Sequence, residues 1–170
     1  KLEEFQNKLL YKKIDIINKE YKKIIDELNS KYNPNNTCKV NETIWQYWDG
    51  DPKPKVVELC MNSISKHSNC KRIVLNDSNL FEYYIPTKTI REKKNNRYIT
   101  NTHFSDILRV NLLYEYGGAW MDATILFTKE QKFLFKDEYW TINSEPKNPP
   151  LKGKWVCYAI SAQKNNKLMY

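Results

Sequence analysis

Cysteine and long apolar runs are both scarce in this sequence, and each scarcity excludes a class of protein. The four cysteines are Cys38, Cys60, Cys70 and Cys157. Their spacing is neither that of paired zinc ligands nor that of a disulfide scaffold, so we expect free, partly buried thiols. Such thiols are typical of a reducing compartment, and no signal peptide is visible, which favours a cytoplasmic protein. Because the longest apolar runs are only a few residues, the sequence predicts no membrane-spanning helix.

Histidine is also scarce, since the chain has only two. Neither His67 nor His103 lies in the spacing of a metal-binding pair. The position of His103 favours a capping or packing role, and His67 falls at the end of a predicted helix, where its charge would be favourable.

The composition is that of one soluble globular domain with a positive charge. Of 170 residues, 41% are hydrophobic and 28% are charged, and the net charge is +8. This charge permits anionic partners, but it is spread along the chain and no nucleic-acid-binding motif is present, so we expect no nucleic-acid partner. The one dense basic cluster is Lys88, Arg91, Lys93, Lys94 and Arg97. We interpret it as a solvated loop.

Residues 1–33 predict an N-terminal amphipathic helix. Apolar residues recur at helical spacing up to Leu28, lysine and glutamate occupy the opposite positions, and the helix is expected to extend to residue 31, before Asn33, Pro34 and Asn35 end it. Residues 1–31 contain eight lysines and six acidic residues, so the helix is not markedly basic. Docking on the domain or on a partner helix is therefore favoured over binding to a membrane surface.

Residues 40–170 predict an α/β domain. A strand at 43–48, a helix from Pro54 to about His67 and a strand at 72–75 form a βαβ unit. In such sheets ligands bind at the carboxyl ends of the strands, where the turn at Asp49 lies. The further elements that we expect are short helical pieces at 80–85 and after Pro86, and strands at 139–143 and 155–160.

The first strand carries three aromatic residues, Trp45, Tyr47 and Trp48. Strand alternation places Trp45 and Tyr47 on one face and Trp48 on the other. All three could be core residues. Aromatic residues at the end of a strand could instead form a flat apolar platform.

The segment 101–128 has the pattern of a catalytic segment and begins with a helix, for which Thr102 is the predicted cap. Asp106 and Arg109 stand three residues apart and share one face of this helix. They form either an ordinary surface ion pair or a pair that reaches into a cleft.

A glycine pair, Gly117 and Gly118, ends this helix. Segments 119–121 and 125–127 then predict a short buried strand on either side of Asp122. A carboxylate in such an apolar run is costly to bury unless a cation or hydrogen-bond donors meet it. We therefore expect a partner for Asp122.

The run S-D-I-L-R followed by L-L-Y-E-Y-G-G-A-W-M-D-A-T resembles the signature of the capsular polysaccharide synthesis group of sugar transferases. That group is related to the family 32 glycosyltransferases and, more distantly, to the glucosylating domains of large bacterial toxins. Upstream, T-I-W-Q-Y-W-D-G is similar to the family's first strand. The resemblance covers residues 43–128 and implies a GT-A-type, Rossmann-like nucleotide-sugar-binding domain. It also leads us to expect that the chain is a fragment, with further chain after Tyr170.

The resemblance implies a function for individual residues. The implied donor-binding residues are Trp48, Asp106, Arg109, Gly117, Gly118 and Asp122. Of these, Asp106, Arg109 and Asp122 would be catalytic. Members usually hold a divalent metal with an aspartate-any-aspartate motif, which here is Asp122-Ala123-Thr124. Mn²⁺ or Mg²⁺ would bind Asp122 and Thr124, but a threonine hydroxyl is a weaker ligand than a carboxylate, so metal dependence stays open.

The implied activity is a hexosyltransferase reaction, of the retaining type, in capsule or cell-surface polysaccharide synthesis. The donor would be a nucleotide sugar, a UDP-sugar first of all, and the acceptor a glycan. Peripheral association with a membrane-bound synthesis complex, at the inner face of the membrane, would fit this role. The alternative is a non-catalytic nucleotide-sugar-binding domain.

Overall fold

The computed structural model describes residues 2–31, 41–144 and 154–170, and the chain forms two units, Lys1–Asn33 and Pro34–Tyr170. The first unit is one helix, α1 (Leu2–Lys31), as predicted from its periodicity. The predicted helix-ending residues 33–35 lie outside the described residues. Within the described part of the chain, no helix combines the length and the apolar character needed to cross a membrane.

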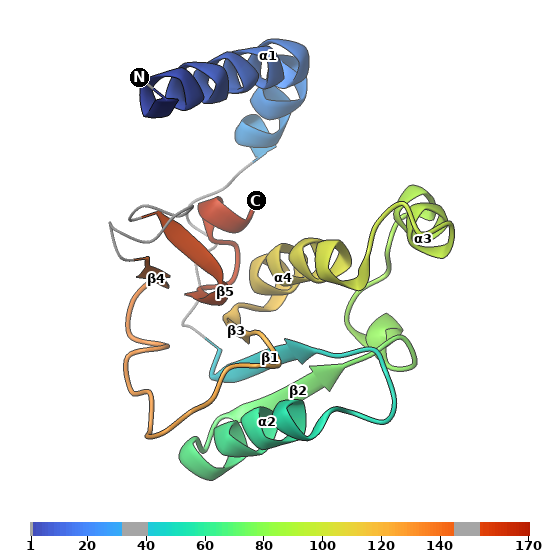
Figure 1. Ribbon diagram of the computed structural model, residues 1–170, viewed down its shortest axis with the longest axis vertical. Coiled ribbons are helices and arrows are strands. Elements are labelled where there is room, and N and C mark those ends of the chain that lie inside the picture. Colours follow the sequence, from blue (N-terminus) through green and yellow to red (C-terminus); the bar gives the residue numbers. More distant parts are fainter. Residues whose placement is uncertain (1, 32–40, 145–153) are drawn as a thin grey trace. The chain divides into compact units, whose positions relative to one another are not determined.

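The second unit is built on a five-stranded mixed sheet with the strand order β2-β1-β3-β5-β4 (Figure 1). The strands are β1 (Thr43–Tyr47), β2 (Lys71–Leu75), β3 (Gly118–Met121), β4 (Tyr139–Asn143) and β5 (Trp155–Ala162). Strand β1 pairs in parallel with β2 and β3, whereas β5 is antiparallel to both β3 and β4. The predicted α/β class is confirmed.

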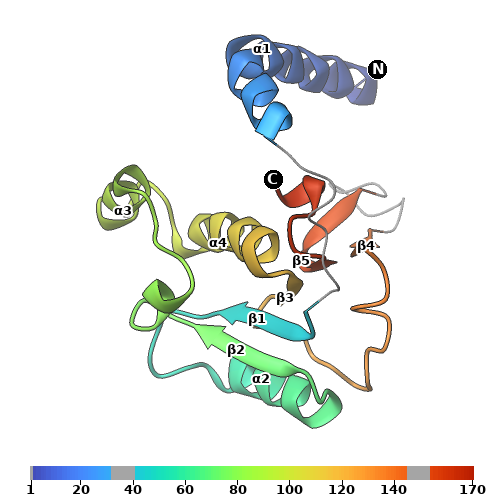
Figure 2. The ribbon, with the colours of Figure 1, turned by 180° about the vertical axis from the view of Figure 1, so that it is seen from behind.

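Helices connect and cover these strands. They are α2 (Lys55–His67), the short 3-10 helix η2 (Leu80–Glu82), α3 (Lys88–Asn95), α4 (Asn101–Tyr116) and the 3-10 helix η3 (Lys167–Met169). Helix α2 joins the parallel strands β1 and β2, so the predicted βαβ unit is confirmed. Figures 1 and 2 show α2 and α4 on opposite sides of these strands.

Each face of the sheet carries its own core because side chains alternate along a strand. Trp45, Tyr47 and Trp120 are buried against the apolar residues of α4. Ile44 lies on the other face with the α2 residue Ile64. Trp48 packs on that same α2 side, so the predicted division of the three β1 aromatics between two faces is confirmed.

The start of α4 differs from the prediction by two residues. Thr100, not Thr102, is the cap, because the Thr100 hydroxyl accepts a hydrogen bond from the backbone N–H of His103 at 3.3 Å. His103 Nδ1 in turn accepts from the backbone N–H of Thr100 at 3.4 Å, which forms a capping box. The predicted capping role of His103 is therefore confirmed.

Two segments predicted from local pattern have a different structure. Residues 125–127 are not a strand, because the chain turns after Asp122, where the N–H of Ile125 donates to the Asp122 carbonyl at 3.0 Å. The basic cluster is not a solvated loop, since α3 spans most of it and Thr87 caps its first turn. Cys60, Cys70 and Cys157 are free thiols as predicted, and Cys38 lies outside the described residues.

Gly118 occupies a position that no larger residue fits. Its φ is +105°, and a Cβ atom there would lie 2.5 Å from the Thr43 carbonyl oxygen and 3.0 Å from Trp45 Nε1. The absence of a side chain thus lets β3 lie against β1. At Gly50, with φ at +155°, a Cβ would meet only Trp48 Nε1, at an ordinary 3.5 Å.

We predict that Gly118→Ala lowers the free energy of unfolding by about 3 kcal/mol or more, because backbone strain and overpacking add at this site. Gly50→Ala, which suffers strain without the clash, should lose about 1 kcal/mol. Chemical denaturation of both variants measures the difference. Equal losses would show that the close approach of β3 to β1 is unimportant.

Candidate active site

Arg109 of α4 is a buried cation that joins two carboxylates. The residue is 4% exposed, and its Nη2 lies 3.0 Å from Asp106 Oδ1 and 3.2 Å from Asp122 Oδ1. Its guanidinium group also lies over the Trp120 ring, 5.1 Å from the centroid. The pair Asp106 and Arg109 is therefore not an ordinary surface ion pair, because it continues through Arg109 to the end of β3.

Asp122 directly follows the last residue of β3. A carboxylate among apolar residues requires a cation or hydrogen-bond donors, and Asp122 has both. Trp120 Nε1 donates to Asp122 Oδ1 at 2.7 Å, and Arg109 contacts the same oxygen. Burial raises the pKa of Asp122, with a smaller increase from Asp106, while the Trp120 hydrogen bond and the Arg109 charge oppose that rise. Among the described residues, these contacts all fall on Oδ1, which leaves Oδ2 available to a ligand.

A cavity of about 330 Å³ lies at the carboxyl ends of β1 and β3. Its lining comes from three segments: Tyr47, Trp48 and Asp49; Asn101, Thr102 and Ser105; and Trp120, Asp122, Ala123 and Thr124. The parallel register aligns Trp45 with Trp120, so the residues that follow β1 and β3 emerge at the same edge. A cavity of this size at this edge suits a small-molecule ligand.

The structure brings some of the predicted site residues together and places others elsewhere. Trp48, Asp122 and Thr124 line the cavity, whereas Arg109 and Asp106 lie behind Asp122 and are not part of the lining. The two glycines lie at the opposite end of β3 from Asp122. Their small size is explained by packing, since a Cβ at either position would clash with neighbouring backbone.

Sequence reasoning placed the turn at Asp49 at the ligand-binding edge without naming Asp49 as a site residue, and it missed three further polar cavity residues, Asn101, Thr102 and Ser105. Asp49 had a signal, because it follows a strand at the ligand-binding edge of a βαβ unit. The other three lie in the first turns of α4, and helix N-termini favour negatively charged ligands. No feature of the local sequence shows that this helix end faces the carboxyl end of β1.

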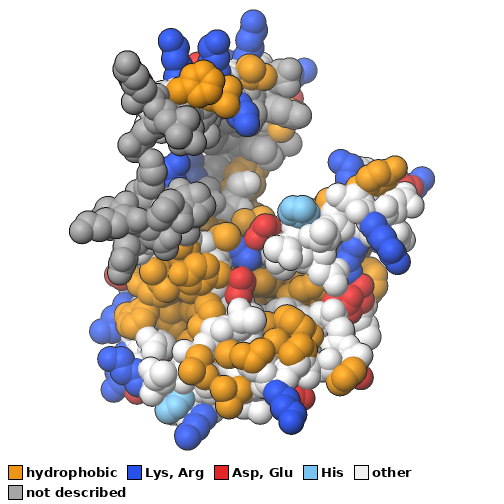
Figure 3. All heavy atoms as spheres, viewed as in Figure 1, with side chains coloured by type: hydrophobic (Ala, Val, Ile, Leu, Met, Phe, Trp, Pro, Cys, Tyr) orange, Lys and Arg blue, Asp and Glu red, His pale blue; other side chains and the backbone are white. Residues whose placement is uncertain are grey.

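Several exposed apolar side chains lie outside this cavity. Figure 3 shows hydrophobic side chains gathered on one face of the second unit. On β5, Trp155 is 59% exposed and Tyr158 is 42% exposed. Exposed aromatic rings of this kind offer surface for an apolar or sugar face.

The described residues do not form a complete metal site. They contain no group of three or more histidine, cysteine, aspartate or glutamate side chains that could hold an ion. At the cavity the chain offers the carboxylates of Asp122 and Asp49 and the exposed Thr124 hydroxyl. Asp122 and Thr124, the predicted pair, fit a hard divalent cation only if the ion takes most of its ligands from water and a phosphate ligand.

The second unit is thus an α/β domain with a cavity of aromatic and polar lining at the ends of parallel strands, and its fold is similar to that of a known glycosyltransferase. The solved structure of the PaToxG glycosyltransferase is 17% identical, with a TM-score of 0.55. The match covers 91% of this chain and 66% of that one, so this chain spans slightly less than two thirds of that length. At this identity the likeness concerns the fold alone. No curated protein matches the chain.

The family follows from the sequence itself. The sequence model of the capsular polysaccharide synthesis protein family matches residues 1–170, and the chain belongs to that family. The resemblance seen in the segments 43–50 and 105–124 is thereby confirmed.

We predict that Asp122→Asn stabilises the free protein at neutral pH. Since the folded-state pKa of Asp122 lies above its ordinary value of 3.8, the folded state binds the proton more tightly than the unfolded chain. The stability that this group contributes is therefore present at low pH and lost as pH rises through the raised pKa. The gain from the variant should shrink as pH falls through the same range, when the wild-type carboxyl becomes protonated.

Urea denaturation of both proteins from pH 7 down to pH 4 measures this effect. A variant that is less stable than the wild type at pH 7 would show instead that the attraction of Arg109 outweighs the burial of the carboxylate.

Proposed function

We propose that this protein is a glycosyltransferase that moves a hexose from a nucleotide sugar to a glycan acceptor in capsule or cell-surface polysaccharide synthesis. The observation that carries the proposal is Asp122, a carboxylate held by Arg109 and Trp120 at the edge of a ligand-sized cavity. A UDP-sugar is the donor to test first. The site of action would be the cytoplasm, at the inner face of the membrane beside a membrane-bound synthesis complex.

The lining of the cavity suggests how such a donor lies. Trp48 offers its ring to the base, and Asp122 contacts the ribose and the sugar. The polar first turns of α4, with Asn101, Thr102 and Ser105, accept the diphosphate, because a helix N-terminus stabilises negative charge. In this arrangement, each of the three lining segments contacts a different part of the donor.

Transfer requires negative charge to be stabilised on the departing diphosphate while positive charge develops on the sugar ring. In the proposed site, Asp122 stabilises the positive charge that develops on the sugar ring. Hydrogen-bond donors of the protein stabilise the negative charge on the departing diphosphate. Arg109, which is itself buried, forms an ion pair with the Asp122 carboxylate and fixes its orientation. Asp106 lies outside the cavity lining and acts in this proposal as the second carboxylate that pairs with Arg109. Retention of the anomeric configuration is part of the proposal.

A divalent cation, Mn²⁺ or Mg²⁺, would supply the charge that a diphosphate leaving group needs. Asp122 and Thr124 are the residues that would hold it. Phosphate oxygens of the donor would supply the remaining ligands of the cation.

Asp122→Asn tests the function directly. The side chain is nearly isosteric but uncharged, so we expect transfer and donor hydrolysis to fall by at least about a hundredfold, as for loss of a group that stabilises charge in the transition state. Release of free nucleoside diphosphate is the measurement. The matched control is Asp137→Asn, an exposed carboxylate outside the cavity, which should leave turnover unchanged.

Two outcomes would contradict this assignment. Unchanged turnover in Asp122→Asn would remove Asp122 from the mechanism. A wild-type protein that binds nucleotide sugars and releases no nucleoside diphosphate would establish the alternative, a non-catalytic binding domain.

The metal can be tested separately by calorimetric titration of Mn²⁺ with and without UDP. With few protein ligands, the wild type should bind Mn²⁺ only when the nucleotide is present, and Thr124→Val should weaken that binding. Tight binding to the protein alone would contradict the proposed ligand set. Nucleotide affinity indifferent to metal would show that protein cations neutralise the diphosphate instead.

A further inference from the structure

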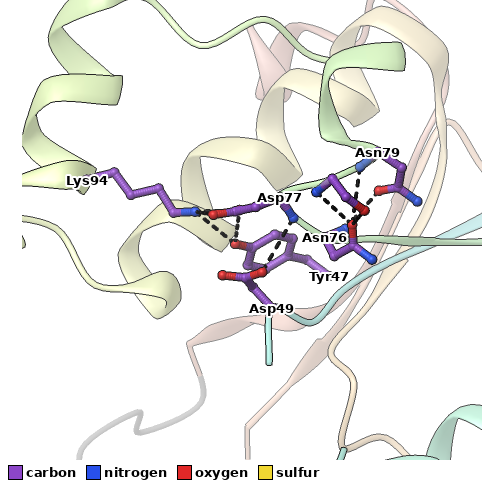
Figure 4. A network of polar contacts seen from close by, with 7 residues as sticks. Tyr47, Asp49, Asn76, Asp77, Asn79 and Lys94 are labelled. Atoms are coloured by element: carbon purple, nitrogen blue, oxygen red, sulfur yellow. Dashed lines mark hydrogen bonds and ion pairs between the residues drawn. The ribbon is translucent and has the colours of Figure 1, made fainter. Parts of the chain in front are cut away.

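Asp77 lies in a network of polar contacts with Tyr47, Asp49 and Lys94 at the end of β1 (Figure 4). Its Oδ1 accepts a hydrogen bond from the Tyr47 hydroxyl at 2.9 Å, and its backbone N–H lies 3.5 Å from Asp49 Oδ1. Tyr47 and Asp49 both line the cavity and stand on either side of Trp48. One residue in the loop after β2 thus contacts both neighbours of the proposed base-stacking tryptophan.

Lys94 of α3 completes this network. Its ammonium group contacts both carboxylate oxygens of Asp77 and donates to the Tyr47 hydroxyl at 3.2 Å. The Lys94 side chain is only 17% exposed, and its charge lies 4.7 Å from the centroid of the Phe104 ring on α4. This cation is therefore packed between aromatic rings and an opposite charge.

The ionisation states in the network suit this arrangement. Burial alone would raise the pKa of Asp77, but the hydrogen bonds from Lys94 and Tyr47 outweigh it and hold that pKa below its ordinary value. Burial, with the Asp77 contact, raises the pKa of Tyr47. At neutral pH Asp77 is thus a carboxylate and Tyr47 is a neutral donor, as their hydrogen bond requires.

Helix α3 is attached to the rest of the second unit through Ile90 and Lys94. None of its residues is fully buried, but Ile90 packs against the core that contains Tyr47 and Phe104. Among the described residues, Lys94 is the α3 side chain that forms hydrogen bonds with other elements. Meanwhile the opposite wall of the cavity, at Asp122, has its own support in Arg109 and Trp120. The two walls are therefore held by separate networks.

Resting on the function proposed above, we propose that Asp77 and Lys94 are positioning residues for the nucleotide half of the donor. They fix Tyr47, Trp48 and Asp49, so they set donor affinity, whereas the transfer step depends on the Asp122 wall. Loss of the Lys94 charge leaves the Asp77 carboxylate without its cation and loosens the side chains at the end of β1, whose backbone stays paired with β2 through the hydrogen bond from the Trp48 N–H to the Leu75 carbonyl.

The first test compares Lys94→Met with Lys93→Met, its exposed neighbour on α3, and with Lys94→Arg, which keeps the charge. For Lys94→Met we expect the Kd for UDP and the KM for the donor to rise about tenfold, the loss expected for one charged hydrogen bond, with kcat nearly unchanged. Lys93→Met should bind like the wild type, and Lys94→Arg should recover most of the affinity. A Lys94→Met protein with wild-type Kd and KM, or one whose kcat falls instead, would overturn the proposal.

A second variant and a second measurement distinguish failure of the positioning role from loss of folding and from failure of the proposed function. Asp77→Asn still accepts the Tyr47 hydrogen bond but lacks the charge that Lys94 requires. Amide hydrogen exchange should become faster at residues 47–49 and remain unchanged at 118–122. If the wild type binds no nucleotide, the proposed function fails, and this exchange pattern still decides the positioning role. Unchanged exchange at 47–49, or equal acceleration in both segments, would overturn it.

Discussion

The pairing of one buried guanidinium group with two carboxylates is the constraint on which the cavity depends. Arg109 is almost fully removed from water, and a buried charge without a partner costs several kcal/mol in a protein interior. Its contacts with Asp106 and Asp122, and its place over Trp120, satisfy that requirement. The same contacts join α4 to the end of β3, so the charge that must be neutralised also determines where Asp122 lies.

Strand geometry explains why this carboxylate faces a ligand cavity and not the core. Strands β1 and β3 run in parallel, so Tyr47 to Asp49 and Asp122 to Thr124 emerge at one edge of the sheet. At the other end of β3, Gly118 permits contact with the β1 backbone that any side chain would prevent. Close packing at one end of the strands therefore accompanies a cavity of aromatic and polar lining at the other.

The cavity has a buried polar atom that the described part of the protein leaves unpaired. Among the described residues, the buried side-chain atoms without a hydrogen-bond partner belong to Gln46, Trp48, Arg109 and Ser161, and of these residues only Trp48 lines the cavity. Most buried polar atoms in proteins are paired, so Trp48 Nε1 is a donor that a ligand in this cavity could satisfy. At the other wall, burial raises the pKa of Asp122.

Local sequence pattern was sufficient to predict most of the helices and strands. It also predicted that one residue, Asp122, requires a partner. Helical and alternating periodicities predicted α1, α2 and the strands β1, β2, β4 and β5 to within about two residues. The position of Asp122 in an apolar run predicted that this residue must have a partner, and the pattern that contains it resembled the family to which the chain belongs. These properties depend on neighbours in the chain, which a sequence displays directly.

The tertiary structure alone decided which distant residues meet. Arg109 could have been half of a surface ion pair, and only the packing of α4 on the sheet turned it toward Asp122, 13 residues away. Lys94 belonged to a basic run that suggested a solvated loop, yet it lies against Asp77, 17 residues away, because a helix formed there and turned one lysine inward. Such pairings follow from chain topology and from the requirement that buried charges be matched, and neither is visible in the local spacing of residues.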